Sequence, residues 1–361
     1  MSRTGETVDL FETFDQNEVE TLVRRHFGLS IPRLRFSREA VETVLRAEFE
    51  NVEIVRVEGF TVGGPNELYH VVARNPDHEF VLKVIYKGTE SGLAGYMCAR
   101  EAYALSVAAT LRFTSPALYA FYPDGGQLDR PYLVISCLDG DPLALNTSFL
   151  SSEKLVQIGR QMGEAVRQLH SVVFDAYGDL PVPDTTPPEA DYKPLVWGIS
   201  GELNEVVEAR IAYLLELYVS HGVFGAADRD ALASALRDAF RSLADVSHPT
   251  LAHMDLEPKN ILVATQDVRR PYRGLADFDR ALALPAEADL AVMMNRWELG
   301  ASAGRRAAYP YFKRGFFEGY RPAETLGAGW EDRAATFFAL ESLERLYVPD
   351  ARDHLRQFVC S

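Results

Sequence analysis

The stretch HMDLEPKNILV, residues 253–263, places three polar side chains just ahead of a short apolar run. Asp255 and Asn260 are five positions apart, and Pro258 between them is incompatible with an ordinary helix interior. The apolar run at 261–263 is typical of a strand, so His253, Asp255 and Asn260 belong to a loop that leads into it. Polar side chains grouped in this way on a loop favour a functional site over a packing role.

A second aspartate follows a second short strand signal. Gly274, Leu275 and Ala276 lead to Asp277, which lies 22 residues after Asp255, a separation that a hairpin can close. Phosphoryl transfer needs a carboxylate that orients or deprotonates the attacking hydroxyl, together with oxygen ligands for Mg²⁺ on the nucleotide phosphates. Asp255 suits the first task, and Asn260 and Asp277 suit the second.

The composition is that of an ordinary globular protein. The chain has 361 residues, of which 47% are hydrophobic, and this is enough for two packed lobes or domains. Its formal net charge of −15 argues against a nucleic-acid partner and is compatible with a cationic substrate. The sequence contains neither a membrane-length apolar run nor a secretory signal, so we expect a cytoplasmic monomer or homodimer without a membrane partner.

The spacing of the three cysteines indicates neither a metal site nor a disulfide framework. Cys98, Cys137 and Cys360 are an odd number and lie far apart in the sequence. We interpret them as reduced thiols.

Hydrophobic periodicity predicts an N-terminal part built on a small antiparallel sheet. Runs rich in β-branched residues occur at 52–57, 68–72 and 80–85, and two further strands are expected at 118–122 and 132–136. A helix at 93–111, which contains Glu101, separates the third strand from the fourth. Two more helices, one after Asn17 and one after Ser37, form a helical extension over residues 1–50.

The remainder of the chain is predicted to be mostly helical. A helix capped by Ser151 or Ser152 is followed by a proline-rich stretch at 180–194 and by helices near 202–218 and 231–243. We therefore expect an α+β fold with two lobes and a boundary near residues 137–142: a five-stranded antiparallel β lobe with one helix, then a mostly helical lobe.

Two segments together resemble the signature of a known family. HMDLEPKNILV, followed by LADFDRALALPAEADLA at 275–291, is similar to the paired motifs of the aminoglycoside phosphotransferase and choline kinase-like superfamily. These small-molecule kinases have a protein kinase-like two-lobe fold. The resemblance implies that Asp255 is the catalytic residue, that Asn260 and Asp277 hold Mg²⁺, and that His253 and Asp289 support the site structurally.

Motifs earlier in the chain agree with this resemblance, which spans roughly residues 50–320. Lys83 in VLKVI matches the phosphate-binding lysine of the family, and Glu101 in AREAYAL matches the helix glutamate that pairs with it. An ammonium group in a strand interior is costly to bury without such a partner. The resemblance divides the chain into an N-terminal nucleotide-binding lobe, 1–137, and a helical C-terminal catalytic and substrate lobe, 138–361.

Two further segments are expected to contact the nucleotide. PYLVISCLDGDPL, at 131–143, resembles the strand and hinge of the family, so backbone groups of Ser136, Cys137 and Leu138 are expected to face the nucleobase. Gly63 and Gly64, in the loop after the first strand, would let backbone amides approach the phosphates, although the same glycines also suit a plain hairpin turn.

The sequence also departs from the family pattern. Met254, Glu257 and Lys259 occupy positions where the family often has Gly, His and Gly. Lys259 is interpreted as a solvated side chain, with contact to the transferred phosphate as the alternative. HMD and DFD replace the HRD and DFG of protein kinases, and no activation segment ending in Ala-Pro-Glu is present, which disfavours a protein kinase.

These observations predict an ATP- or GTP-dependent phosphotransferase, with Mg²⁺, that phosphorylates a hydroxyl of a small molecule. An antibiotic acceptor of the aminoglycoside, nucleoside or peptide class is favoured, and a metabolic kinase of the choline, homoserine, methylthioribose or fructosamine type is the alternative. A nucleotide-binding pseudokinase is the non-enzymatic alternative. The acceptor is expected near 183–225 and 290–320, where Trp197, Trp297 and Tyr309 would stack on a ring of the acceptor. Three glutamates on one helix face either bind a cationic acceptor or form a solvated face: Glu202, Glu205 and Glu208.

Overall fold

The structure is a computed structural model that describes residues 36–59, 66–75, 77–86, 92–183, 196–241, 243, 248–299 and 301–360. The helix predicted after Asn17, and Gly63 and Gly64, lie outside the described residues.

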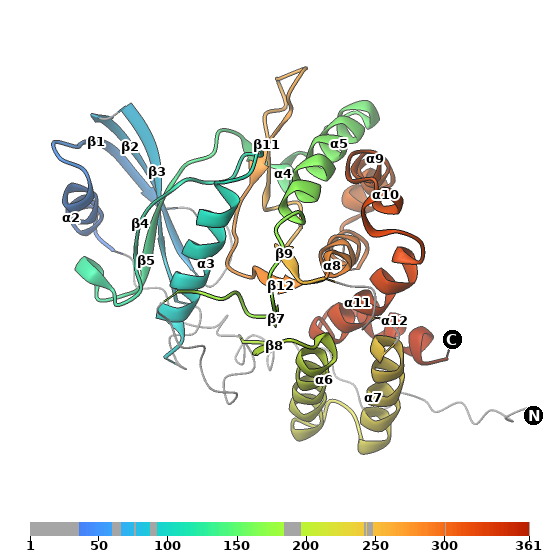
Figure 1. Cartoon of the computed structure of the whole chain (residues 1–361). Coiled ribbons are helices and arrows are strands. Elements are labelled where there is room, and N and C mark those ends of the chain that lie inside the picture. The colour runs from blue at the N-terminus through green and yellow to red at the C-terminus, as the bar shows by residue number, and fades with distance from the viewer. Residues whose placement is uncertain are drawn as a thin grey trace, which may run out of the picture.

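Five antiparallel strands form the sheet of the N-terminal part (Figure 1). Their spatial order is β1-β2-β3-β5-β4, and every neighbouring pair is antiparallel. The bounds are β1 (Glu53–Gly59), β2 (Glu67–Asn75), β3 (Asp77–Val84), β4 (Leu118–Tyr122) and β5 (Tyr132–Ser136), with a short 3₁₀ helix at Gly126–Leu128 before β5. The predicted five-stranded antiparallel sheet is therefore confirmed.

Each face of this sheet is covered by one helix, because side chains alternate between the two faces of a strand. Phe80, Leu82 and Val84 of β3 join the core under α2 (Arg38–Glu48). Leu133 and Ile135 of β5 face the other way and share a core with α3 (Ala94–Ala108). Lys83 lies between Leu82 and Val84 and so points to the α3 side of the sheet.

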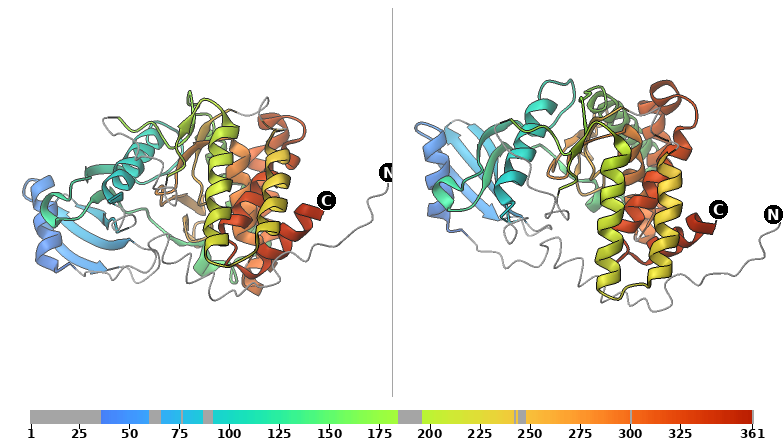
Figure 2. Two further views of the ribbon diagram at one scale, coloured as in Figure 1. Left: turned by 90° about the horizontal axis from the view of Figure 1, so that it is seen from below. Right: turned by 60° about the horizontal axis from the view of Figure 1, so that its bottom comes forward.

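The remainder of the chain is mainly helical (Figure 1). Its helices are α4 (Leu143–Asn146), α5 (Ser152–Leu169), α6 (Leu203–Ser220), α7 (Ala226–Arg241), α8 (Ala286–Glu298), α9 (Ala303–Tyr320), α10 (Pro322–Leu326), α11 (Trp330–Glu344) and α12 (Pro349–Cys360). Its short strands are β6 (Asp141–Pro142), β7 (Tyr177–Gly178), β8 (Ile199–Ser200), β9 (Thr250–Ala252), β10 (Ile261–Val263), β11 (Tyr272–Leu275) and β12 (Leu282–Leu284). Figure 2 shows α6 and α7 side by side in the helical part of the chain.

None of the helices in the described part of the chain has both the length and the apolar character that crossing a bilayer requires.

Helices α5 and α9 pack against each other at very short range. Ser151 caps α5, its side chain accepting from the Lys154 N–H, and Leu155, Ile158 and Met162 of the predicted apolar stripe are buried. Small residues make the close approach of the two backbones possible: Gly159 and Gly163 on α5 and Gly315 and Gly319 on α9. A methyl group on Gly163 would lie 2.1 Å from the carbonyl oxygen of Phe316.

Gly163→Ala is therefore expected to destabilise the protein by about 1–3 kcal/mol, because two backbones must move apart. Helix propensity alone predicts the opposite sign, since alanine is the better helix former. The midpoint of urea unfolding measures the difference. Gly201→Ala is the matched control, since a methyl group there meets no atom within 4 Å; equal midpoints for the two variants would contradict the packing argument.

Candidate active site

Two adjacent hairpin strands bring the two polar loops together. β10 follows the 253–260 loop, β11 precedes Asp277, and Ile261 pairs with Leu275 in an antiparallel register. The Ala276 N–H donates to the carbonyl oxygen of Asn260 at 2.9 Å, which places the residue before Asp277 against the end of the first loop. The predicted hairpin is thus present.

Lys83 links the five-stranded sheet to this second loop. Its Nζ donates to the Glu101 carboxylate of α3 at 2.8 Å and to Asp277 Oδ1 at 2.6 Å. The side chains of Lys83 and Glu101 are buried, whereas that of Asp277 is 33% exposed. The structure therefore brings together three of the residues singled out in the sequence, although 194 positions separate Lys83 from Asp277.

These contacts determine the charge states of Lys83 and Glu101. Burial by itself favours the neutral amine, but the carboxylates of Asp277 and Glu101 raise the pKa of Lys83 above its ordinary value. Burial raises the pKa of Glu101 to about 7, in opposition to the nearby Lys83 charge. Lys83 consequently stays a cation across the physiological range and can attract phosphate.

Asp255 is buried among positively charged and amide groups. Asn260 Nδ2 donates to its Oδ2 at 2.8 Å and to its backbone carbonyl at 2.9 Å. Lys259 Nζ lies 3.3 Å from Oδ2, and Arg296 Nη2 lies 3.7 Å from Oδ1. Burial favours the neutral acid, but the Lys259 and Arg296 charges hold the pKa of Asp255 well below its ordinary value. Asp255 is therefore a carboxylate at neutral pH.

Lys259 is solvent-exposed, as the sequence favoured, and it is also paired with carboxylates. Its Nζ pairs with Glu257 Oε1 at 2.6 Å as well as with Asp255, although the side chain remains 47% exposed. The ammonium group is thus held beside Asp255 by two carboxylates.

His253 and Asp289 shape the first loop. The Asp289 carboxylate accepts the N–H groups of His253 at 2.7 Å and Met254 at 2.6 Å. His253 Nε2 contacts the Ala276 carbonyl at 3.0 Å, so this nitrogen donates, and Nδ1 accepts the Asp255 N–H at 3.3 Å. Met254 has φ of +60°, an uncommon value for a residue other than glycine, and Asp289 stabilises that conformation.

Asp289→Ala is expected to lower the free energy of unfolding by about 3 kcal/mol or more, because two buried N–H groups and His170, 3.0 Å from Oδ2, lose their acceptor. Thermal or urea unfolding measures the loss. Glu164→Ala, at an exposed position on α5, is the control and should change stability by less than about 0.5 kcal/mol. A loss below about 1 kcal/mol for Asp289→Ala would show that the loop holds its shape without this carboxylate.

Two backbone N–H groups of the predicted hinge segment are already bonded within the sheet. The N–H groups of Ser136 and Cys137 donate to the carbonyl oxygens of Ala117 and Glu79, at 2.8 and 2.9 Å. Neither N–H is available to a nucleobase while these bonds last. Leu138 is the candidate donor that remains of the three predicted residues.

Several charged residues near the site were not recognised in the sequence. Arg100, next to Glu101 on α3, donates to Asp179 Oδ1 at 2.8 Å and to the Asp279 carbonyl at 2.7 Å, so it ties α3 to the loop that carries Asp277. Arg296 pairs with Glu341 at 2.8 Å beside Asp255. These residues belong to no local motif, and only their burial in the fold reveals them.

The ring-stacking expectation is wrong for two of the three aromatic residues. Trp297 is fully buried and stacks on Phe312 with ring centroids 4.3 Å apart, and Tyr309 is also buried. Trp197 is partly exposed, and Arg210 lies over its ring at 5.2 Å. Glu202 and Glu205 are exposed, and Ser200 donates to Glu205.

The oxygen donors at the site fit a hard divalent cation. Asp277 bonds to Lys83 through Oδ1 and carries a second carboxylate oxygen, and Asn260 uses its amide nitrogen for Asp255. Carboxylate and amide carbonyl oxygens are ligands that Mg²⁺ accepts. Asn260 and Asp277 therefore remain the residues that would hold it.

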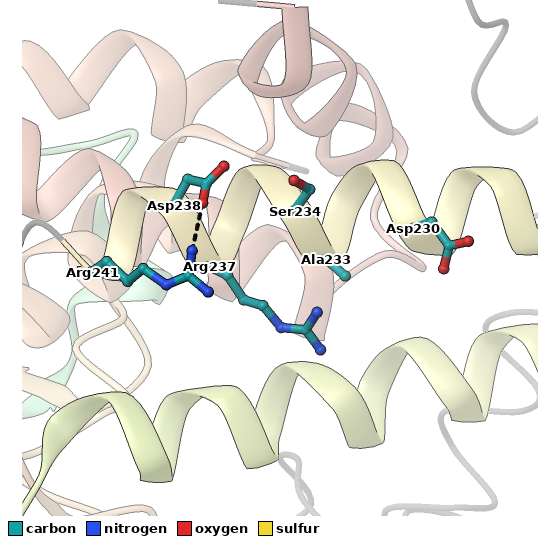
Figure 3. Close-up of a pocket in the computed structure, with 6 residues that line it drawn as sticks. All are labelled: Asp230, Ala233, Ser234, Arg237, Asp238 and Arg241. Atoms are coloured by element: carbon teal, nitrogen blue, oxygen red, sulfur yellow. Dashed lines mark hydrogen bonds and ion pairs between the residues drawn. The ribbon is translucent and has the colours of Figure 1, made fainter.

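Among the hollows on the described helical part of the chain, two stand out. One, on the outer surface of α7, lies along a single helix, and its two arginines balance its two aspartates (Figure 3). It is lined by Asp230, Ala233, Ser234, Arg237, Asp238 and Arg241. The other adjoins the 253–260 loop and is lined by Trp197, Met254, Ala288, Val292, Phe337, Leu340, Glu341 and Glu344. Only the second borders the candidate site.

Solved structures of several other proteins have the same fold. A proposed fructosamine-3-kinase from Haemophilus somnus 129PT is 15% identical, with a TM-score of 0.61 over 89% of this chain and 96% of that chain. A proposed fructosamine-3-kinase from Thermobifida fusca YX-ER1 is 19% identical, with a TM-score of 0.60 over 89% of this chain and 98% of that chain. Wild-type aminoglycoside 2'-phosphotransferase-IIIa, in a GDP complex, is 15% identical, with a TM-score of 0.56 over 90% of this chain and 99% of that chain.

No curated protein has significant sequence similarity to the chain. The sequence profile of the phosphotransferase enzyme family, in contrast, matches residues 56–326. That match covers both the five-stranded sheet and the two polar loops. The predicted protein kinase-like fold is confirmed, and the chain belongs to the phosphotransferase enzyme family, as a phosphotransferase of the small-molecule kinase type.

Proposed function

We propose that this enzyme transfers the terminal phosphoryl group of ATP or GTP to a hydroxyl of a small molecule. One observation carries the proposal: Lys83 contacts Asp277, and the neighbouring loop contains Asp255 bonded to Asn260. A phosphate-attracting cation, oxygen ligands and a buried carboxylate thus lie on or beside two loops that are joined by the backbone bond from Ala276 to Asn260. The pseudokinase alternative is disfavoured because none of these groups is missing.

Each residue has one task in this proposal. Lys83, held by Glu101, binds phosphate oxygens of the nucleotide, and Leu138 donates its N–H to the nucleobase. Asp255 accepts a hydrogen bond from the acceptor hydroxyl and aligns its oxygen for in-line attack on the phosphorus. The attacking oxygen forms its bond to phosphorus as the bond to the leaving diphosphate oxygen breaks, and the hydroxyl proton passes to Asp255 or to solvent.

Asn260 and Asp277 would hold Mg²⁺ on the nucleotide. When bound, the ion would supply positive charge to the phosphate oxygens. Lys83 would then exchange its contact with Asp277 for the phosphate, because the carboxylate is needed as a ligand. The GDP complex of the aminoglycoside phosphotransferase supports a nucleotide donor for this fold.

The acceptor is proposed to be an antibiotic that presents a hydroxyl to Asp255. The hollow beside Met254, about 10 Å³, is too small to enclose such a molecule; it is lined by the ring of Trp197 and by the carboxylates of Glu341 and Glu344. Both carboxylates already pair with arginines, Glu341 with Arg296 and Glu344 with Arg210. The charge near Asp255 is therefore largely balanced, which favours a nucleoside or peptide antibiotic with few positive charges over a polycationic aminoglycoside.

A metabolic sugar-amine kinase is the second candidate. Two structures with the same fold are proposed fructosamine-3-kinases. Such an enzyme would use the same residues on the nucleotide and differ only in the residues that contact the acceptor.

The test is nucleotide consumption with ATP and GTP in Mg²⁺ across aminoglycoside, macrolide, peptide and nucleoside antibiotics, together with choline, homoserine, methylthioribose and fructosamines. Mass spectrometry then looks for a gain of one phosphoryl group on the acceptor. Phosphorylation of one antibiotic, abolished by Asp255→Asn, supports the antibiotic proposal, and phosphorylation of a metabolite alone replaces it with the second candidate. Tight nucleotide binding with no modified acceptor would favour the pseudokinase.

A further inference from the structure

Three side chains with metal-ligating chemistry meet on the five-stranded sheet, outside the set that contains Asp255 and Asp277. They are His70 on β2, Glu79 on β3 and Cys137 immediately after β5, and their ligand atoms all lie within 4.8 Å of one another. His70 Nε2 is 2.7 Å from Glu79 Oε2. An imidazole nitrogen, a carboxylate oxygen and a sulfur therefore point into one small volume.

The strand register explains why these residues meet. Phe80 pairs with Ser136, so the preceding Glu79 lies opposite Cys137, whose N–H donates to the Glu79 carbonyl at 2.9 Å. On its other side Glu79 pairs with Val72, and His70 is two residues from Val72. Because side chains two apart on a strand share a face, all three project from the same face of the sheet.

We propose that His70, Glu79 and Cys137 form a binding site for Zn²⁺. Zinc prefers imidazole nitrogen, thiolate sulfur and carboxylate oxygen, and it accepts three protein ligands with water in the fourth position. Ligand atoms about 2.0–2.3 Å from a tetrahedral zinc are separated by about 3.3–3.8 Å. His70 Nε2 and Glu79 Oε2, 2.7 Å apart, lie closer than that and all three ligand atoms lie within 4.8 Å, so the Glu79 side chain, 55% exposed, would turn to adjust these separations.

The donor set separates this site from the predicted magnesium ligands. Asn260 and Asp277 offer only oxygen, whereas thiolate and imidazole favour a softer ion. Glu79 and Lys83 are four residues apart on β3, or about 13 Å along the strand. Zinc binding can therefore be measured on the protein without nucleotide, independently of phosphoryl transfer.

The state of Cys137 provides a second, measurable consequence. Burial and the nearby carboxylates of Glu79 and Asp139 raise the pKa of the Cys137 thiol above its ordinary value, so the free protein carries the protonated thiol at neutral pH. Zinc binds the thiolate, so the S–H proton leaves to solvent as the Zn–S bond forms. Affinity should consequently rise with pH between 6 and 8.

The experiment is a titration of the full chain, freed of metal by a chelator and kept reduced, with Co²⁺ and then Zn²⁺. We expect one Co²⁺ per chain with a thiolate-to-cobalt charge-transfer band, displaced by one equivalent of Zn²⁺. Cys137→Ser should abolish the band and weaken zinc binding by at least about 100-fold, since a direct ligand is lost. Cys98→Ser and Cys360→Ser are the matched controls and should retain both the charge-transfer band and the zinc affinity.

Glu79→Gln keeps the test decisive if Cys137→Ser folds poorly, because the exposed side chain contributes little to folding. It should weaken zinc binding and leave the unfolding midpoint unchanged. Absence of the band from the wild-type chain, or zinc affinity unaffected by Cys137→Ser and Glu79→Gln, would overturn the proposal and leave an ordinary His70–Glu79 hydrogen bond beside an unrelated thiol.

Discussion

Asp255→Asn is expected to lower kcat by about two to four orders of magnitude while the affinity for nucleotide stays nearly unchanged. The substitution preserves the size of the side chain and an oxygen that can accept from Asn260 Nδ2. It removes the negative charge that lies between Lys259 and Arg296. An amide oxygen is a poor proton acceptor, so the acceptor hydroxyl loses the group that orients it and takes its proton.

Steady-state kinetics with the acceptor found in the panel measures kcat, and direct binding measures nucleotide affinity. Glu257→Gln is the matched control, because Glu257 lies on the same loop and pairs with the same Lys259 at 2.6 Å. A single, partly exposed ion pair is worth at most about 1 kcal/mol, so this control should change kcat less than about fivefold. If Asp255→Asn kept full turnover, or lost nucleotide binding to the same degree as turnover, the role of Asp255 would have to be abandoned.

The second large effect is expected for Asp277→Asn, which should weaken binding of the Mg-nucleotide. We expect its affinity to fall by at least about 100-fold, because a carboxylate ligand to the ion becomes a neutral amide. Asparagine is the right substitute, since residue 277 has φ of +66°, a conformation that asparagine tolerates better than alanine. The backbone of the loop should therefore persist.

The presence of magnesium distinguishes ligand loss from general damage. In chelator, nucleotide binding by Asp277→Asn should equal or exceed that of the unmodified chain, because the lost carboxylate repels phosphate and competes for Lys83 at 2.6 Å. Asp139→Asn, with an exposed side chain, is the control and should bind the Mg-nucleotide normally. Equal loss of binding with and without magnesium would show that Asp277 is needed for the loop and not for the ion.

Local sequence predicted much of the fold because its signals are short-ranged. The strands at 118–122 and 132–136 match β4 and β5, and the helix expected at 93–111 is α3 over Ala94–Ala108. Alternation and helical spacing are properties of a few neighbouring residues, so one chain reports them directly. The helix expected at 231–243 begins earlier, at Ala226, because the apolar stripe marks the buried face and not the helix start.

The roles of individual buried groups could not be predicted in this way. Lys259 reads as an ordinary surface lysine, and its contact with Asp255 depends on how the 253–260 loop turns. Trp297 looks in the sequence like a candidate ring for an acceptor, yet it is fully buried and stacks on Phe312 of α9. The boundary between residues 137 and 138, and the roles assigned to Gly63 and Gly64, stay predictions.

The sequence by itself determined the chemistry that the chain can offer: the types and spacing of Asp255, Asn260 and Asp277, the lysine in a strand and the alternation of a small sheet. Those features are local, because they depend on residue types and on the spacing of residues a few positions apart. Only the tertiary structure decided which charges meet, because Lys83 reaches Asp277 across 194 positions and His70, Glu79 and Cys137 converge through strand register. Proximity of that kind arises when segments that are distant in the sequence bury a common core, and a short-range sequence pattern does not predict it.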